Sequence, residues 1–449
     1  MSDRKKVLEL FYENKDVLSE KINSGIEKNR KGDIKIKISD KDGNALNGAK
    51  VTLKQKSHEF RFGANLFLLD ELETEEKNEL YKKYFKETFN MATLPFYWNT
   101  LEPEKGKPRY AKNSVKWYRR PSIDLCMEFC EENGIEPREH ALAYESTFPD
   151  WLKDKDVHEI KKELERRYKE ISERYKDKIR TIEVTNEMNW SFGKTAFYNQ
   201  PDYVEWCFKT AEKYFPNNQL VINESTEETW LDNCRATDKY YSYAEATILK
   251  GARVDAVGMQ FHMFYPKELE YEKTRRLYSP TSLYAHMDMY SALSKCLQIT
   301  EVTIPAYSND AEDENIQAEL LTLLYSIWFS HPSVEQIVYW NLVDGYAYVP
   351  DPTPEAISRS MGNMTVGENY YYGGLVRFDM TPKPAYYAIK KLIHETWHTE
   401  LSALTNDGGC VETRGFYGDY ELTVTYGEKS VSKLITVSSK GDNRYSIII

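Results

Sequence analysis

The sequence between about residues 60 and 340 repeats one unit, a short apolar run followed by a longer stretch with helical spacing. The runs return at intervals of roughly 30 to 50 residues, the rhythm of β-strands alternating with α-helices. Eight such units predict an α/β protein built on a closed (β/α)8 TIM barrel. An open doubly wound sheet is the runner-up, but no glycine-rich phosphate loop follows the first run. The predicted strands are 60–64, 89–93, 136–142, 181–187, 220–223, 254–262, 297–301 and 337–340.

Outside this repeat, apolar and polar residues alternate with the period of two that is typical of half-buried strands. Residues 33–38 and 49–53 alternate on either side of a turn sequence at 40–44, which predicts a β-hairpin. Residues 420–426, 431–437 and 445–449 alternate in the same way. Because isolated hairpins are marginally stable in water, strands from both ends are expected to combine into a small β-sandwich beside the barrel.

The predicted organisation therefore has three parts. An N-terminal helix occupies 1–31, with a rough apolar stripe over about 4–29. The β-sandwich takes 32–58 together with 400–449, and the barrel takes 59–399. No aromatic triad marks a sugar-binding face on the sandwich strands, so we favour a brace for the barrel over a carbohydrate-binding module.

Composition narrows the possible partners. The formal net charge of −11 disfavours nucleic acid, which binds a basic face. The chain shows neither an apolar segment of the ~20 residues that a membrane span needs nor a secretory signal at Met1. We therefore expect no membrane partner and a cytoplasmic location, or secretion if a signal has been removed. The six cysteines are scattered without metal-type spacing, which indicates reduced thiols. The oligomeric state stays open.

Two glutamates end predicted strands. Glu187 closes the fourth strand and Glu301 the seventh. The C-terminal ends of barrel strands carry the chemistry of this fold, and retaining glycoside hydrolysis needs two carboxyl groups about 5–5.5 Å apart. In such a pair an ionised Glu301 would raise the pKa of Glu187 and keep it protonated for donation. Asn186 could bind the sugar 2-hydroxyl, and His262 could orient Glu301.

Each of these residues also has an ordinary interpretation. A single strand-terminal glutamate is more often an ion-pair partner, and His140, Gln260 or Trp340 alone would be unremarkable. Their order favours a site, because each closes a different predicted strand at the same end. Two other classes remain: a non-catalytic carbohydrate-binding barrel, and a metal-dependent hydrolase using His140 and His262. The second is disfavoured because no His-x-His pair closes the first strand. No cofactor and no metal are predicted.

From about residue 60 to 395 the chain resembles glycoside hydrolase family 10, the retaining endo-β-1,4-xylanases. The resemblance rests on short motifs in the same order and at compatible spacing. The matching positions are Phe62 and Gly63, Phe89 and Asn90, Glu102 with Pro103 and Gly106, Arg138 and His140, Pro149 and Trp151, Val184 to Glu187, Pro216 and Asn217, Asn223, Asp255 to His262, Ile299 to Glu301, Tyr339 and Trp340, Asp344 to Tyr346, Leu375 to Asp379, and Lys383 to Tyr387.

This resemblance implies a role for each matched polar residue. Glu187 would be the acid/base and Glu301 the nucleophile. The residues lining the subsite where the bond breaks would be His140, Asn186, Gln260, His262 and Trp340. The partner would be a β-linked carbohydrate, xylan-like by default.

The chain departs from the family pattern in two loops. A Glu-Asn pair and a lysine that hold sugars in the family are missing from 93–99, after the second strand. Tyr144 and Glu145 stand where the family has Trp-His. Sites built from polar groups discriminate through them, so weaker xylan binding, or a non-xylan β-glycan, is the alternative.

Tyr144, Glu145 and Trp98 complete the candidate substrate-binding residues. Phe96, Tyr97 and Trp98 could offer stacking surface, although at least one is expected to pack in the barrel. Glu145 has two possible roles. It could form an ion pair with Arg138 or a loop lysine, or it could contact an unusual substituent on the sugar. The exact glycan and endo versus exo action stay open.

Overall fold

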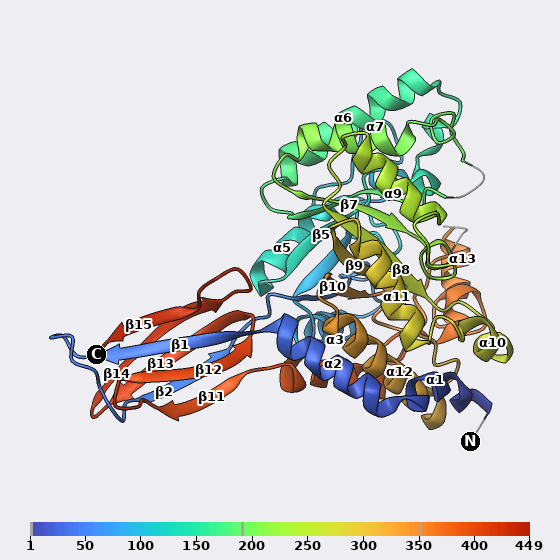
Figure 1. Cartoon of the computed structure of the whole chain (residues 1–449). Helices are drawn as coiled ribbons and strands as arrows, with labels where there is room; N and C mark the ends of the chain where they lie inside the picture. The colour runs from blue at the N-terminus through green and yellow to red at the C-terminus, as the bar shows by residue number, and fades with distance from the viewer. Residues whose placement is uncertain (1–2, 190–192, 350–352) are drawn as a thin grey trace.

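The computed structural model describes residues 3–189, 193–349 and 353–449, and its central element is a closed barrel of parallel strands (Figure 1). The barrel order is β10-β3-β4-β5-β6-β7-β8-β9, so neighbouring strands follow one another along the chain and the last pairs with the first. The prediction of a (β/α)8 barrel is confirmed. Its strands are β3 (Arg61–Asn65), β4 (Met91–Pro95), β5 (Glu136–His140), β6 (Thr181–Asn186), β7 (Gln219–Glu224), β8 (Ala256–His262), β9 (Cys296–Thr303) and β10 (Val334–Tyr339).

Helices surround the barrel and bury their apolar faces against the strands (Figure 1). In α6 (Val157–Tyr175), Asp156 and Glu159 form a capping box, and Ile160 and Leu164 lie on the buried face. The other longer helices are α3 (Glu75–Lys86), α5 (Ile123–Asn133), α7 (Tyr203–Tyr214), α9 (Lys239–Leu249), α11 (Pro280–Ser291), α12 (Ala311–Ser330) and α14 (Pro384–Lys391). Of the helices described, none combines the length and apolarity needed to cross a bilayer.

Shorter helices and turns lie in the connections. The short α-helices are α4 (Trp98–Leu101), α8 (Thr226–Trp230), α10 (Glu270–Thr274) and α13 (Pro354–Ser360). The 3₁₀ turns are η2 (Glu145–Thr147), η3 (Asp150–Leu152), η4 (Lys267–Leu269) and η5 (Gly367–Tyr371), and η6 (Leu392–Thr396) is a π-helical turn.

The N-terminal segment packs against the barrel as η1 (Asp3–Leu8), α1 (Glu9–Glu13) and α2 (Lys15–Arg30) rather than as one continuous helix. The break is at Asn14, whose φ of −129° and ψ of 42° are not helical. Helix α2 lies close to α12, since a Cβ on Gly25 would come 2.7 Å from the carbonyl oxygen of Ser330. Met1 and Ser2 lie outside the described residues.

The two chain ends form the predicted β-sandwich, which projects from the barrel (Figure 1). One sheet has the order β12-β1-β15 and the other β11-β2-β13-β14. Alternate residues of both sheets fill a separate core, including Ile34, Ile36, Val51 and Leu422. The strands are β1 (Lys31–Ser39), β2 (Lys50–Gln55), β11 (Glu400–Leu404), β12 (Cys410–Phe416), β13 (Gly418–Tyr426), β14 (Lys429–Val437) and β15 (Arg444–Ile448).

The predicted N-terminal hairpin is wrong. β1 pairs with β12 and β15, whereas β2 pairs with β11 and β13, so the turn at 40–44 carries the chain from one sheet to the other. Both strands do alternate as predicted, and both bury their apolar residues in the same core. The pattern identified the strands but not their partners, which come from the far end of the chain.

Candidate active site

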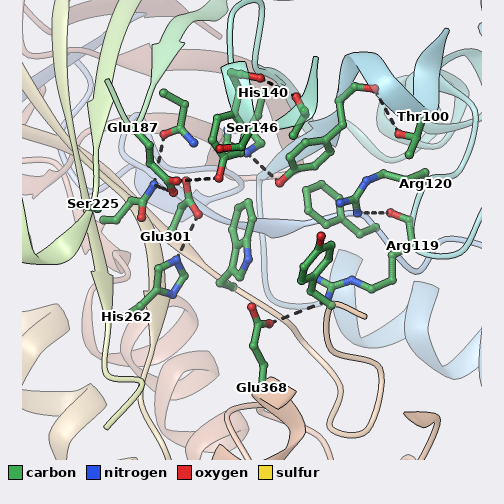
Figure 2. A pocket seen from close by; sticks show the side chains of 18 of the residues that line it. Thr100, Arg119, Arg120, His140, Ser146, Glu187, Ser225, His262, Glu301 and Glu368 are labelled. Carbon is green, nitrogen blue, oxygen red and sulfur yellow. Dashed lines mark hydrogen bonds and ion pairs between the residues drawn. The ribbon is translucent and has the colours of Figure 1, made fainter. Parts of the chain in front are cut away.

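A cavity of about 420 Å³ opens where the barrel strands end (Figure 2). The predicted site residues that line it are His140, Tyr144, Asn186, Glu187, Gln260, His262, Glu301 and Trp340. They come from the ends of β5, β6, β8, β9 and β10 or from the loops that follow these strands. The barrel thus brings together residues that lie up to 200 positions apart in the sequence.

Glu301 is buried in the cavity wall between two hydrogen-bond donors. The His262 Nε2 lies 3.1 Å from its Oε2, and Asn223 Nδ2 donates to its Oε1 at 3.2 Å. The His262 Nδ1 lies 2.9 Å from Thr303 Oγ1, and burial lowers the pKa of His262. With the neutral ring protonated on Nε2, His262 donates to Glu301 and accepts from Thr303.

The electrostatic bias within the glutamate pair differs from the expectation. Burial is the largest cause and raises the pKa of Glu301 to about 8, against the opposing effect of His140. Repulsion between the two carboxyl groups predicts an ionised Glu301. Desolvation outweighs the charges around Glu301 in the free cavity.

This raised pKa makes stability depend on pH in a definite direction. The group ionises near pH 4.5 in the unfolded chain but near pH 8 in the folded one, so folding is increasingly disfavoured as pH rises from 4.5 to 8. Replacing Glu301 by glutamine removes this titration. We expect the Tm of Glu301→Gln minus that of the wild type to grow by about 2–5 °C across that interval.

Thermal melts from pH 4 to 9 measure this difference. Loss of a hydrogen bond in the variant would shift the Tm difference by the same amount at every pH. Only the change of the Tm difference with pH therefore reports the titration of Glu301. The control is Glu428→Gln, exposed in the turn between β13 and β14, which should show a constant offset. A flat difference for Glu301→Gln would contradict the buried-acid interpretation.

Glu187 leaves the end of β6 with an unusual backbone conformation. Its φ is 53°, in the left-handed region, and its N–H donates to the Asn223 carbonyl at 3.2 Å. Gln260 Nε2 donates to its Oε1 at 3.0 Å, and the Tyr144 hydroxyl donates to its Oε2 at 2.6 Å. Two neutral donors therefore fix the carboxyl in the cavity.

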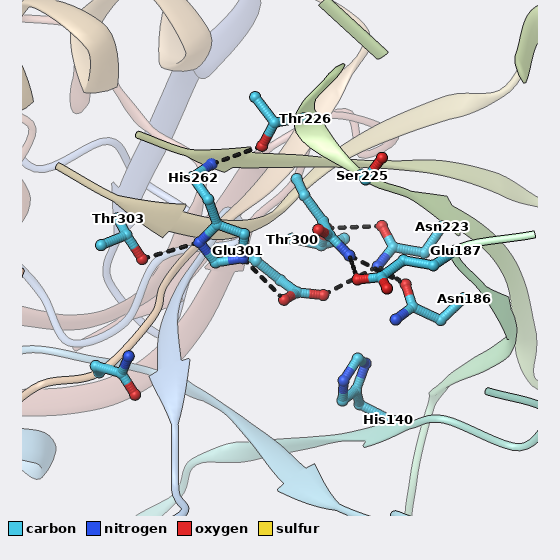
Figure 3. Close-up of polar contacts among 12 residues, drawn as sticks. His140, Asn186, Glu187, Asn223, Ser225, Thr226, His262, Thr300, Glu301 and Thr303 are labelled. Atoms are coloured by element: carbon cyan, nitrogen blue, oxygen red, sulfur yellow. Dashed lines mark hydrogen bonds and ion pairs between the residues drawn. The ribbon is translucent and has the colours of Figure 1, made fainter. Parts of the chain in front are cut away.

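One hydrogen-bonded network joins the two glutamates (Figure 3). The Asn186 Oδ1 accepts from Asn223 Nδ2 at 2.9 Å and from Gln260 Nε2 at 3.2 Å. Thr300 donates to the Asn223 Oδ1 at 2.7 Å, which sets the orientation of the amide. A Cβ on Gly258 would lie 2.3 Å from that oxygen, so only glycine fits beside it.

A buried charged group that the sequence analysis missed contacts the cavity-lining residue His140. The Glu183 carboxylate lies 2.8 Å from His140 Nδ1 and pairs with Arg138. Burial opposes ionisation of Glu183, but His140 and Arg138 together lower its pKa. A signal was present, since Glu183 is an ionisable residue between the apolar Ile182 and Val184 inside a strand.

The ligand atoms of His140, Glu183 and Glu301 lie within 4.8 Å of one another, close enough to hold a metal ion. Their partners argue against that use. Arg138 already supplies a positive charge to Glu183, and the His140 Nε2 lies 2.9 Å from the Tyr97 hydroxyl. Both ring nitrogens of His140 are engaged, so this set of donors suits a hydrogen-bonded support better than a cation.

Comparison with known proteins identifies the family. The model of glycosyl hydrolase family 10 matches residues 55–392, which include every barrel strand. The chain belongs to glycosyl hydrolase family 10. The fold and the resemblance expected from the sequence are both confirmed.

The similarity of this family 10 chain to curated relatives extends beyond the barrel to most of the chain. It is 25% identical to endo-1,4-beta-xylanase 2 of Arabidopsis thaliana over 429 residues, 94% of this chain and 35% of that protein. It is 27% identical to anti-sigma-I factor RsgI6 of Acetivibrio thermocellus over 409 residues, 90% of this chain and 46% of that protein. The chain spans between about a third and a half of the length of the first curated relatives it matches.

Solved family 10 structures superpose on the barrel. Native xylanase 10B from Thermotoga maritima matches with a TM-score of 0.58 at 22% identity, covering 75% of this chain and 96% of that one. Xylanase 10B from Thermotoga petrophila RKU-1, in complex with xylobiose, gives a TM-score of 0.59 at 22% identity, covering 75% and 95%. At this identity the likeness establishes the fold.

Two predicted site residues of this family 10 protein lie outside the cavity. Trp98 is 1% exposed, packs edge-on against Phe148 and donates to Glu102 at 2.8 Å. It begins the short helix α4, whose first turn directs it into the core. Glu145 is also buried, and its Oε1 accepts from the Thr195 backbone N–H at 2.7 Å. Neither lines the cavity, and among the described residues Glu145 forms neither the ion pair with Arg138 nor one with a loop lysine.

Tyr97 occupies the position that the sequence analysis gave to Trp98. It lines the cavity, and its ring packs edge-on against Phe67 and His140. Trp340 meets Phe67 edge-on on the other side, with ring centroids 5.1 Å apart. Phe96, one residue earlier, is fully buried in the core. Of Phe96, Tyr97 and Trp98, only Tyr97 therefore lines the cavity.

Proposed function

We propose that this family 10 protein is a retaining glycoside hydrolase that cleaves β-1,4 bonds of a xylan-like glycan. The observation that carries the proposal is the pair Glu187 and Glu301, which come from separate strands, face one cavity and share one hydrogen-bonded network. Several relatives named endo-1,4-beta-xylanase support the choice of substrate. We expect the two carboxyl groups about 5–5.5 Å apart when a sugar is bound.

The proposed reaction has two displacements. Glu301 attacks the anomeric carbon while Glu187 protonates the leaving oxygen, giving a covalent glycosyl-enzyme and a free sugar end. Glu187 then removes a proton from water, which attacks the same carbon and releases Glu301. Glu301 must be ionised to attack, and the donors on His262 and Asn223 favour that form.

The surrounding residues support these two roles. Tyr144 and Gln260 each donate a hydrogen bond to one carboxyl oxygen of Glu187, so this carboxyl group is positioned before substrate binds. Asn186 is available to the 2-hydroxyl of the sugar at the cleavage point, and Trp340 and Tyr97 form the apolar wall beside it. A non-xylan β-glycan is the second candidate substrate, favoured by the different polar groups of the loop after β4.

A binding role without catalysis is the second candidate function. The observation in its favour is the similarity to a protein named as an anti-sigma factor over 90% of this chain. Such a role would need the cavity to hold a glycan but not to cleave it. Both carboxyl groups and their donors are retained in the cavity, which favours hydrolysis.

Product analysis tests the proposal and separates these candidates. The protein is incubated with β-linked polysaccharides and oligosaccharides, with released reducing ends as the first measurement. We expect cleavage of at least one β-1,4-linked pentose or hexose polymer. Proton NMR of the first product should show the β-anomer before mutarotation. An α-anomer would reject the retaining mechanism, and glycan binding without any new reducing end would favour the binding role.

A further inference from the structure

One wall of the cavity is positively charged. Arg119 and Arg120 end the long connection from β4 to α5 and line the cavity on the side opposite His262 and Ser225 (Figure 2). Glu187 and Glu301 lie beside His262 and Ser225, across the cavity from the two arginines (Figure 2). A neutral glycan has no group that requires two adjacent guanidinium groups, so this wall calls for a separate explanation.

The two guanidinium groups have fewer acceptors than donors. The Arg119 Nη2 donates to Asn341 Oδ1 at 2.6 Å, while its Nε and Nη1 are buried without an acceptor. Arg120 Nη1 donates to the Arg119 carbonyl at 2.8 Å, and its Nε is buried without an acceptor. Each buried donor without a partner calls for an explanation, such as an ion or water that it binds.

Their charge is also incompletely neutralised. Glu368 lies 4.0 Å from Arg119 Nη1, at the limit of an ion pair, and also accepts from Asn341. Among the described residues no carboxylate lies within ion-pair distance of Arg120, which instead stacks on the Tyr97 ring with its Cζ 3.9 Å from the ring centroid. Two cations therefore face one distant carboxylate in a half-enclosed cavity, an arrangement that an added anion would stabilise.

We propose that this wall binds the carboxylate of an acidic sugar, so that the preferred glycan carries a uronosyl residue next to the bond that is cleaved. A guanidinium group offers paired parallel N–H donors that match the two oxygens of a carboxylate. The positive charges of Arg119 and Arg120 also offset the repulsion that Glu187 and Glu301 would exert on an anionic sugar. This inference deepens the proposed function, since it names the substrate class of the same cavity.

A matched pair of ligands isolates the carboxylate. Xylo-oligosaccharides carrying one glucuronic acid substituent are compared with the same material after reduction of the carboxyl group to an alcohol. Binding is measured by calorimetry to the Glu301→Gln protein, which does not turn over the ligand. We expect the acidic form to bind about tenfold more tightly than the reduced form, with a difference that shrinks when salt is added.

Variants then assign the preference to the wall. In the Glu301→Gln background, Arg120→Gln should bring the two affinities within twofold, and Arg120→Lys should retain part of the difference. The control is Lys116→Gln, which removes a positive charge from the same connection. Lys116 is exposed and does not line the cavity, so the tenfold preference should remain.

The outcomes are separate from those of the proposed function. Equal binding of both ligands to Glu301→Gln, or an equal loss for both ligands on Arg120→Gln, would overturn the acidic-sugar site and leave Arg120 as a brace for Tyr97. A wild type that hydrolyses no β-glycan would reject the proposed function. The binding preference could still be measured in that case, because the assay does not require turnover.

Discussion

Replacing Glu301 by glutamine is expected to lower kcat/KM on the preferred glycan by roughly 10⁴- to 10⁶-fold, because an amide cannot replace the carboxylate as nucleophile at the anomeric carbon. Binding should persist, since the His262 ring and the Asn223 amide that surround Glu301 are unchanged. The measurement is steady-state hydrolysis together with glycan binding. A loss smaller than about a hundredfold would reject Glu301 as the nucleophile.

The matched control is Glu224→Gln. Glu224 is as deeply buried as Glu301 and ends strand β7, which is separated from β9 by β8, and burial likewise raises its pKa to about 8. It does not line the cavity; its oxygens accept from the backbone N–H groups of Ser225 and Asn189. We expect this variant to keep kcat/KM within about threefold, which would separate loss of the nucleophile from loss of a buried carboxyl.

Azide gives a second measurement on the same residue. In Glu301→Gly the space of the side chain is open to a small anion, which can displace the phenolate of an activated aryl glycoside directly. One displacement inverts the anomeric carbon, so the product should be the α-glycosyl azide. A β-azide would place the nucleophile elsewhere.

Replacing Glu187 by glutamine is expected to have the second largest effect, and its size should depend on the leaving group. Cleavage of a natural glycan needs a proton on the leaving oxygen, so kcat/KM should fall by about 10²- to 10⁴-fold. An aryl glycoside with an acidic phenol needs little protonation, so its kcat/KM should change much less. Its kcat should fall, because water no longer has a base and the glycosyl-enzyme accumulates.

Azide distinguishes this role from that of Glu301. It needs no base, so it should restore kcat in Glu187→Gln and give the β-glycosyl azide through two displacements. Glu145→Gln is the control, since Glu145 is buried near the site but bonds the Thr195 backbone outside the cavity. Equal losses on natural and activated substrates would contradict the acid/base role of Glu187.

The barrel was predictable because each of its strands carries its own local signal. β6 and β9 are short apolar runs that end in polar residues, and α6 shows a regular apolar stripe between charges. The pairing of the sandwich strands was not predictable in this way. β1 and β2 have the same alternation, and nothing in either strand states which distant strand completes its sheet.

The site was predictable where a residue follows a strand directly and unpredictable where a loop intervenes. Asn186 and Glu187 follow from the end of β6, whereas Tyr97 and Trp98 differ by one position in a loop whose helix α4 sends only the first to the cavity. Arg119 and Arg120 were missed for the same reason, since they come late in a long connection. The desolvation of Glu301 depends on all the residues that bury it, and many of these are distant in the sequence, so the local sequence pattern does not predict it.

Because the sandwich combines strands from both ends of the chain, its N-terminal strands are synthesised long before their pairing partners. Lys31 of β1 pairs with Phe416 of β12, 385 positions later, so β1 leaves the ribosome roughly 20–80 s before its neighbour exists at 5–20 residues per second. Throughout that wait Ile34, Ile36 and Ile38 have no sheet to join. Lys35 and Lys37 between them keep the nascent segment charged, a guard against premature association with other newly made chains.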